Sequence, residues 1–271
     1  MAANATNSVA RPNDAAVSGF SRSLTLHGSD LSYDDPPDLD ARLRGAEAIV
    51  SISRFNADYL REHFPHVRPR RLEIIPMGIP PLPEPELRPA RGDVLRILHV
   101  GRLYEHKAQH HLIEACARLA ARGVAFRCDL VGGGELRDEL AASIAWHGLQ
   151  NHVRLLGPRF HDEVLALYGT ADLFVLCSIT EGQPVVLMEA MRAGIPLIAT
   201  AVAAVPELVQ DGGILVPPAD PEALADAIQA VADRRVDTAK LIERARSIVA
   251  EQYDLETNHR RFAAFLVSLC D

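Results

Sequence analysis

From Leu95 onward, short aliphatic runs alternate with longer amphipathic stretches, and this alternation constrains the fold more than any other feature of the sequence. Short aliphatic runs are typical of strands that are buried on both faces of a parallel sheet. Between two of them, Leu112, Cys116 and Leu119 recur at i, i+4 and i+7 and form one apolar helix face. Strands alternating with helices predict an α/β fold with a parallel, doubly wound sheet. We expect its strands at Leu95–Val100, Phe126–Val131, Val153–Leu156, Leu173–Cys177, Leu197–Thr200 and Ile214–Val216.

The first third of the chain is organised differently. Residues 1–20 are small and polar, which predicts a disordered leader. Only three short strands follow, too few for an open sheet of the usual size, and five prolines between Pro80 and Gly92 indicate a linker. We therefore expect a partial first domain over residues 21–85, a complete second domain over 86–255 and a final helical segment over 256–271. The early elements are expected to be strands at Leu24–His27, Ala48–Ile52 and Leu72–Pro76 and helices at Asp40–Ala46 and Arg54–His63, the second capped by Ser53.

Composition excludes several classes of protein. The net charge is −8 and no basic stripe is present, which argues against nucleic-acid binding. No run of about 18 apolar residues could cross a membrane, and Met1–Phe20 lacks the layout of a secretory signal, so we expect a cytoplasmic protein. The Arg-rich stretch Arg68–Arg71 is expected to be a solvated face, with contact to a membrane surface as the alternative. The isolated cysteines predict buried thiols, with neither a zinc site nor disulfides: Cys116, Cys128, Cys177 and Cys270.

The segment from Ser178 to Ala190 is the most informative part of the sequence. It begins where a predicted strand ends and then opens a helix, the place where α/β sheets bind ligands. Backbone amides around Gln183 to Val186 would lie in the first helical turn, where an anion is favoured. Glu181 and Glu189 would flank a bound phosphodiester and accept hydrogen bonds from sugar hydroxyls, which is the chemistry of a nucleotide sugar. The alternative is that Glu181 merely precedes a helix and Glu189 lies on a solvated face.

A second candidate group follows the first strand of the second domain. Gly101 makes a turn at the end of that strand, and Arg102 and Lys107 come after it. Both cations would lie at the same crevice and could bind a diphosphate through charge-assisted hydrogen bonds. The alternative is two ordinary surface cations.

These segments resemble the motifs of family 4 retaining glycosyltransferases, which have the GT-B fold. The resembling motifs are Gly101-Arg102-Leu103 with Lys107, Leu130 to Leu136, Val153 to Gly157, Ala171 to Val175, the Glu-x7-Glu pattern at 181–189, Pro206 to Val209 and Leu215 to Pro218. They occur in family order across residues 94–235. The segment from Glu181 to Val186 is similar to the bacterial branch that builds exopolysaccharide and lipopolysaccharide.

The resemblance implies a role for each matching residue. Glu189 would hold the ribose hydroxyls of the donor, and Glu181 would hold hydroxyls of the transferred sugar. Arg102 and Lys107 would stabilise the negative charge that develops on the leaving diphosphate. The other donor-binding residues would be Gly101, Gly182, Gln183, Val185 and Val186.

The implied reaction is transfer of a hexosyl group from a nucleotide-diphosphate sugar to a hydroxyl, with retention at the anomeric carbon. The acceptor would be a glycan or a lipid-linked glycan. The resemblance implies neither a metal nor another cofactor, and attack from the front face without an enzyme nucleophile. A peripheral position on the inner face of the membrane is a further expectation.

The first third also matches the family, over the last part of its N-terminal domain. The matching segments are Leu24 to Asp30, Ile52 to Asn56 and Ile74 to Ile79. His27 would then be a catalytic residue at the interdomain cleft, and the helix Asn258–Leu269 would fold back toward the first domain. About 100 residues expected at the front of such a domain are missing. The alternative function is therefore a catalytically incomplete remnant that binds nucleotide sugars.

Three other patterns are given a structural interpretation. Gly132-Gly133-Gly134 follows a strand, but Arg137 stands where the dinucleotide-binding fingerprint requires its last glycine. Asp38-Leu39-Asp40 resembles a metal-binding Asp-x-Asp, yet its position before a helix predicts an N-cap. The cluster of His106, His110 and His111 lacks a carboxylate or cysteine nearby and is expected to lie at the surface or the cleft.

Overall fold

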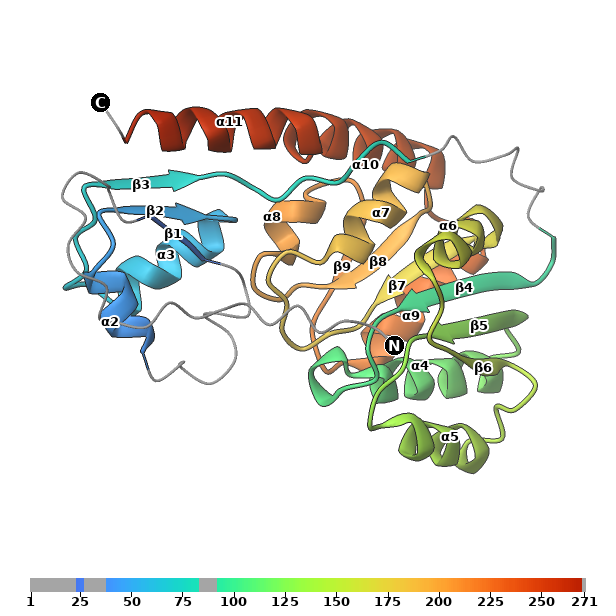
Figure 1. Ribbon diagram of the computed structural model, residues 1–271. Coiled ribbons are helices and arrows are strands. Elements are labelled where there is room, and N and C mark those ends of the chain that lie inside the picture. Colours follow the sequence, from blue (N-terminus) through green and yellow to red (C-terminus); the bar gives the residue numbers. More distant parts are fainter. Residues whose placement is uncertain (1–22, 27–37, 83–91, 270–271) are drawn as a thin grey trace.

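Two parallel β-sheets organise the chain (Figure 1), as described by a computed structural model over residues 23–26, 38–82 and 92–269. The larger sheet has the order β6-β5-β4-β7-β8-β9, with every adjacent pair parallel. Its strands are β4 Leu95–Val100, β5 Phe126–Val131, β6 Val153–Gly157, β7 Leu173–Leu176, β8 Leu197–Thr200 and β9 Ile214–Val216. The winding direction reverses between β4 and β7, because later strands are added outward from β4 on one side and from β7 on the other.

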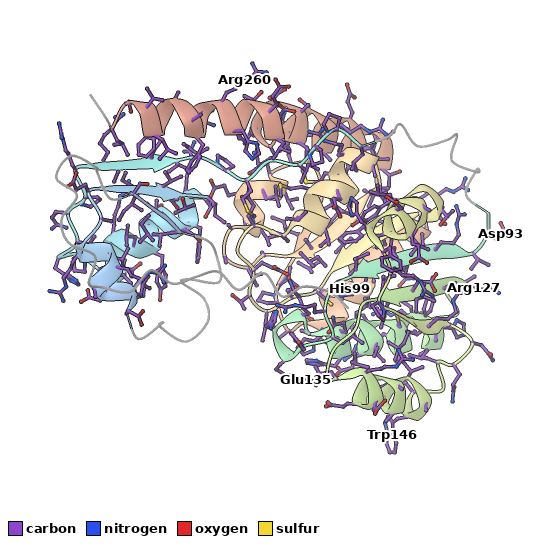
Figure 2. All side chains as sticks on the ribbon, viewed as in Figure 1. Asp93, His99, Arg127, Glu135, Trp146 and Arg260 are labelled. Carbon is purple, nitrogen blue, oxygen red and sulfur yellow. The ribbon has the colours of Figure 1, made fainter. Side chains whose placement is uncertain are left out.

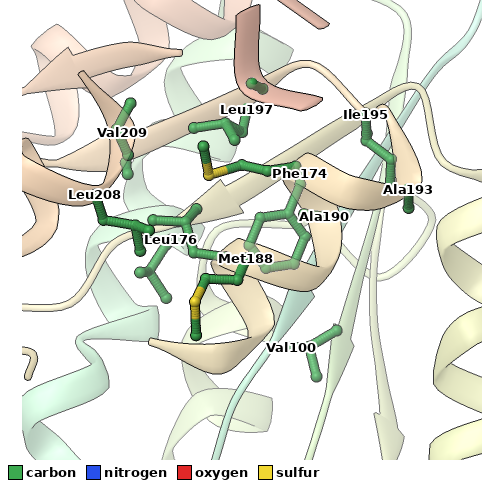
Figure 3. Close-up of a cluster of buried hydrophobic side chains, with 14 of the residues drawn as sticks. Val100, Phe174, Leu176, Met188, Ala190, Ala193, Ile195, Leu197, Leu208 and Val209 are labelled. Carbon is green, nitrogen blue, oxygen red and sulfur yellow. The ribbon is translucent and has the colours of Figure 1, made fainter. Parts of the chain in front are cut away.

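Helices cover both faces of this sheet, and the strands alternate their side chains between the two faces. In β7, Phe174 and Leu176 enter one hydrophobic cluster whereas Leu173 and Val175 enter the other. Figure 3 shows part of the first cluster, where Met188 of α7 lies close to Phe174 and Leu176. The first face is covered by α6 His161–Thr170, α7 Val185–Ala193, α8 Val205–Val209 and α10 Thr238–Gln252, and the second by α4 Gln109–Ala121, α5 Arg137–Trp146 and α9 Pro221–Ala232. This set of elements is the large domain.

The smaller sheet has the order β1-β2-β3, also parallel, and consists of β1 Ser23–Leu26, β2 Ala48–Ser51 and β3 Arg71–Ile74. On one face, Leu26 and Ile49 pack with Leu39 and Leu43 of helix α2 Leu39–Arg44 and Leu60 of α3 Arg54–His63. The other face is covered by α11 Leu255–Val267, whose Phe265 packs on Ala48, Val50 and Ile75. We call β1, β2, β3, α2, α3 and α11 the small lobe. Helix α11, drawn red in Figure 1, runs from the large domain across this sheet.

The chain passes between the large domain and the small lobe twice, at residues 78–79 and at residues 253–255, and these two passages lie side by side. The N–H of Ile79 donates to the carbonyl of Tyr253 at 2.9 Å, and the N–H of Leu255 donates back to the carbonyl of Ile79 at 3.2 Å. The backbones approach so closely at Gly78 that a Cβ there would lie 2.4 Å from the Cα of Leu255. Only glycine fits this contact.

The predicted α/β fold is confirmed, and most elements begin and end within a residue or two of the expected positions. Ser53 caps α3 by accepting a hydrogen bond from the N–H of Asn56, as expected. Asp38 occupies the N-cap position of α2, as expected, but its side chain makes no capping hydrogen bond. The expected leader, His27 and Cys270 lie outside the described residues. The short helix η1 Glu105–Lys107 and helices α8, α9 and α10 were not predicted.

Two other expectations concern buried thiols and membrane spans. Cys116, Cys128 and Cys177 are buried and carry free thiols, as predicted. Among the helices of the described ranges, none is both long and apolar enough to cross a bilayer.

Candidate functional site

A cavity of about 610 Å³ opens at the point where the winding of the large sheet reverses. Adjacent strands β4 and β7 both end there, and such a switch point is where open α/β sheets bind ligands. The cavity is lined by the segments that follow β4 and β7, by the glycine loop after β5, by two residues after β6 and by the start of α7. Two residues next to the small sheet also line it, one before α3 and one after β3. The polar, glycine and proline residues of the lining and these two neighbours are Gly101, Arg102, His106, Lys107, Gly132, Gly133, Pro158, Arg159, Glu181, Gly182, Gln183 and Pro184, with Val185 and Val186 of α7, Ile52 and Met77.

The segment after β4 is held in place by a buried polar network. Gln109 donates to the carbonyl of Arg102 at 2.8 Å and lies 3.2 Å from Nε2 of His99, which is fully buried in β4 (Figure 2). Because the carbonyl of Val175 can only accept, Nδ1 of His99 is the protonated nitrogen and Nε2 accepts from Gln109. Burial lowers the pKa of His99 to about 4, so the ring is neutral at physiological pH.

The triple glycine after β5 serves packing rather than dinucleotide binding. Gly132 and Gly134 have φ values of +144° and +159°. A Cβ on Gly132 would lie 1.9 Å from the carbonyl oxygen of Gly101, and one on Gly134 would lie 2.3 Å from that of Leu103. Glycine therefore lets this loop approach the backbone on both sides of Arg102.

Lys107 and Glu181 form a largely buried ion pair inside the cavity. Nζ of Lys107 lies 2.6 Å from Oε1 of Glu181, and their side chains are 17% and 7% exposed. The hydroxyl of Ser178 donates to the same carboxylate at 2.6 Å. Lys107 ends η1, and Ala108, which follows it, adopts the left-handed conformation with φ +50°. The surface-cation interpretation of Lys107 is therefore wrong.

Arg102 lies against the ring of Tyr104, with its guanidinium carbon 4.8 Å from the ring centroid. Its side chain lines the cavity together with Lys107, so both predicted cations are brought to the same space. His106, from the predicted histidine cluster, also lines the cavity. Burial, followed by the charge of Lys107, lowers the pKa of His106.

The start of α7 faces the cavity as expected, with one correction to the expected donors. Pro184 occupies the N-cap position and has no N–H, so the first-turn amides nearest the cavity belong to Val185 and Val186. The side-chain oxygen of Gln183 is already hydrogen-bonded, because Oε1 accepts the N–H of Met77 at 2.8 Å. Gln183 thus connects the large domain to the segment that follows β3.

Glu189 lies in the second turn of α7, but it is not among the residues that line the cavity. The residue is 7% exposed, so the solvated-face interpretation is wrong. The hydroxyl of Tyr168 lies 3.0 Å from Oε2 of Glu189 and 3.2 Å from the carbonyl of Val186, which does line the cavity. Burial raises the pKa of Glu189, opposed by the Tyr168 hydrogen bond and the nearby His161. Three of the four predicted charged residues therefore share the cavity, and the fourth lies beside it.

Neither the Asp-x-Asp pattern nor the histidine cluster forms a metal site. Asp40 instead pairs with Arg44 and His66 on the small lobe. Across the ranges that the structure describes, no group of three or more His, Cys, Asp or Glu side chains is arranged to hold a metal ion. The catalytic expectation for His27 falls outside those ranges.

A family model for "Glycosyl transferases group 1" matches residues 86–248, which is more than half of the chain. The chain belongs to this family. Among curated relatives of this chain, the putative colanic acid biosynthesis glycosyltransferase WcaL of Salmonella typhimurium is 39% identical over 66% of this chain and 47% of its own length. The amylovoran biosynthesis glycosyltransferase AmsK of Erwinia amylovora is 34% identical over 73% of this chain and 51% of its own length. The chain thus spans about half the length of these relatives.

Solved structures confirm the GT-B fold. The Anabaena protein Alr3699/HepE in complex with UDP matches 92% of this chain and 72% of its own, with a TM-score of 0.76 and 25% identity. A glycosyltransferase from Rickettsia africae matches 91% of this chain and 70% of its own, with a TM-score of 0.77 and 22% identity, which shows the fold alone.

Proposed function

We propose that this chain binds a nucleotide-diphosphate sugar in the cavity at the β4/β7 switch point and is part of a retaining hexosyltransferase. The observation that carries the proposal is the convergence of Arg102, Lys107 and Glu181 with the N-terminal end of α7 on one cavity. Cations and helix amides suit a diphosphate, whereas a buried carboxylate suits sugar hydroxyls. The UDP complex of the structurally similar HepE supports a nucleotide donor.

The ion pair between Lys107 and Glu181 is compatible with donor binding. A lysine ammonium has three N–H donors, so Lys107 can retain Glu181 and bind a phosphate oxygen with another. Glu181 has two oxygens, and the one not held by Lys107 and Ser178 can accept a sugar hydroxyl. In this proposal Glu189 receives the ribose hydroxyls once the donor lies against Val186.

In the proposed reaction, a bond forms between the acceptor oxygen and the anomeric carbon while the bond from that carbon to the diphosphate oxygen breaks, and the hydroxyl proton passes to the departing oxygen. Attack on the same face gives retention, and no side chain is assigned as a nucleophile. Arg102, Lys107 and the amides of Val185 and Val186 stabilise the charge that accumulates on the leaving diphosphate. Because these groups supply the positive charge, the proposed reaction is metal-independent. Approach of the small lobe excludes water and limits hydrolysis.

The acceptor in this proposal is a hydroxyl of a glycan or a lipid-linked glycan, handled in the cytoplasm or at the inner face of the membrane. The names of the relatives support this class, because they refer to colanic acid and amylovoran biosynthesis.

Calorimetric titration with UDP- and GDP-hexoses tests the donor site. The double variant Arg102→Ala with Lys107→Ala should weaken binding by roughly 100-fold or more, since two charge-assisted hydrogen bonds are lost. Arg127→Ala is the matched control, because Arg127 is an exposed cation on β5 outside the cavity (Figure 2). Normal nucleotide affinity in the double variant would refute the diphosphate assignment.

Binding without transfer is the second candidate function, since the chain spans only about half the length of its curated relatives. Incubation with the tightest-binding nucleotide sugar and an acceptor mixture separates the two candidates. Release of free nucleoside diphosphate above the rate with the Arg102→Ala, Lys107→Ala variant supports an enzyme. Saturable binding with no release supports the binding function.

A further inference from the structure

Glu207 of α8 bridges the large domain and the small lobe. Its Oε1 lies 3.0 Å from the N–H nitrogen of Arg54, and its Oε2 lies 2.9 Å and 3.2 Å from those of Arg54 and Phe55. Arg54 and Phe55 begin helix α3, which packs on the small sheet. A carboxylate of one unit therefore occupies the N-terminal end of a helix in the other.

The groups that cap the first amides of α3 come from both units. The first amides of a helix have no partner within it, and the positive end of the helix dipole favours a negative charge. Ser53, within the small lobe, accepts the third of these amides, that of Asn56, at 3.1 Å. The first two amides are left for Glu207, so α3 is fully capped only when the lobe lies against the large domain.

This contact lies close to the donor cavity and to the passages between the two units. Ile52, directly before the α3 cap, lines the cavity, as does Met77, whose N–H donates to Gln183. Tyr253, at the second passage, has its pKa raised by burial and by the charge of Glu207. The bridge thus holds the part of the small lobe that forms one wall of the cavity.

We propose that Glu207 is a positioning residue, which docks the small lobe over the donor cavity by capping α3. The docking stands on the contacts alone, whereas its effect on sugar transfer rests on the proposed function. Opening of the cavity must break these hydrogen bonds and expose the amides of Arg54 and Phe55 to water. Glu207 therefore sets the balance between open and closed arrangements.

Hydrogen–deuterium exchange and small-angle scattering on the full chain test the proposal. In Glu207→Ala, exchange at Arg54 and Phe55 should accelerate about tenfold or more, while Asn56 stays protected by Ser53. The radius of gyration should increase. The control is Asp211→Ala, which removes a nearby exposed carboxylate whose partner, Arg244, lies in the large domain. That control should change neither measurement.

Glu207→Gln separates the charge from the size of the side chain. The amide oxygen of Gln reaches the same N–H groups without a negative charge, so exchange should lie between that of the wild type and that of Glu207→Ala. Unchanged exchange and scattering in Glu207→Ala would overturn the docking role, and wild-type behaviour of Glu207→Gln would overturn its electrostatic basis. A chain that fails to bind UDP but shows these changes would refute only the proposed function.

Discussion

At the scale of single residues, the candidate site combines charged groups that were visible in the sequence with partners that were not. Glu181, Arg102 and Lys107 could be selected because they follow the ends of strands, and the structure places all three at the cavity. Tyr168 and Ser178, which contact Glu189 and Glu181, could not be selected. Each of those contacts joins side chains whose relative orientation depends on tertiary packing. Among the buried polar partners of the site, His99 could have been noticed in the sequence, because it is a polar residue within an aliphatic strand.

Replacing the carboxylate of Glu189 is expected to increase the stability of the fold and to weaken the binding of the nucleotide sugar. Burial raises its pKa, so the folded protein holds the proton more tightly than the unfolded chain does. The carboxyl therefore favours folding at low pH, and this contribution is lost as pH rises through the raised pKa. Glu189→Gln should increase the free energy of unfolding at pH 8 by about 1 kcal/mol, because it removes a buried charge and keeps an acceptor for Tyr168.

The same substitution should weaken nucleotide-sugar binding about tenfold, since a neutral amide is a poorer acceptor for ribose hydroxyls. In the wild type, affinity should fall as pH drops through the raised pKa, whereas Glu189→Gln should lack that dependence. Urea denaturation and calorimetry across pH 5–8 measure both effects. Glu243→Gln, on the exposed side of α10, is the control. Parallel pH profiles for wild type and Glu189→Gln would contradict the ribose role.

At the scale of elements, the strands of the large domain followed from the sequence with nearly correct bounds. Buried parallel strands such as Leu95–Val100 are continuous aliphatic runs, and the glycine and proline residues between elements mark their ends. Helices α9 and α10 were missed because no strand follows them to define the second boundary. The packing role of Gly132 and Gly134 was also missed, since it depends on a loop that lies about 30 residues earlier in the sequence.

The glycine loop after β5 gives a prediction about packing. Gly134→Ala places a methyl group 2.3 Å from the carbonyl oxygen of Leu103 in a backbone conformation that disfavours side chains. We expect a loss of roughly 3 kcal/mol in the free energy of unfolding and weaker UDP binding, because the Arg102 segment must move. Gly133→Ala is the matched control, as its Cβ would meet only Pro158 at 3.7 Å. Equal stability of the two variants by thermal denaturation would contradict this interpretation.

At the scale of the whole molecule, the large domain and the small lobe are joined where two passages of the chain touch. Gly78→Ala would bring a methyl group within 2.4 Å of the Cα of Leu255 and separate the passages. We expect a loss of about 2 kcal/mol in stability and faster proteolysis between the two units. Gly92→Ala is the control, because a Cβ there would meet nothing within 4 Å. Proteolysis at the wild-type rate in Gly78→Ala would contradict the prediction that this contact holds the two units together.

Helix α11 also determines the order in which the protein can be completed during synthesis. Its Phe265 closes the apolar face formed by Val50 and Ile75, although these residues leave the ribosome long before the helix does. Most of the core of the large domain lies between residues 95 and 249, so this domain can begin to fold once that stretch has emerged. Strands β1 to β3 must therefore wait, with one face exposed, until α11 has been translated.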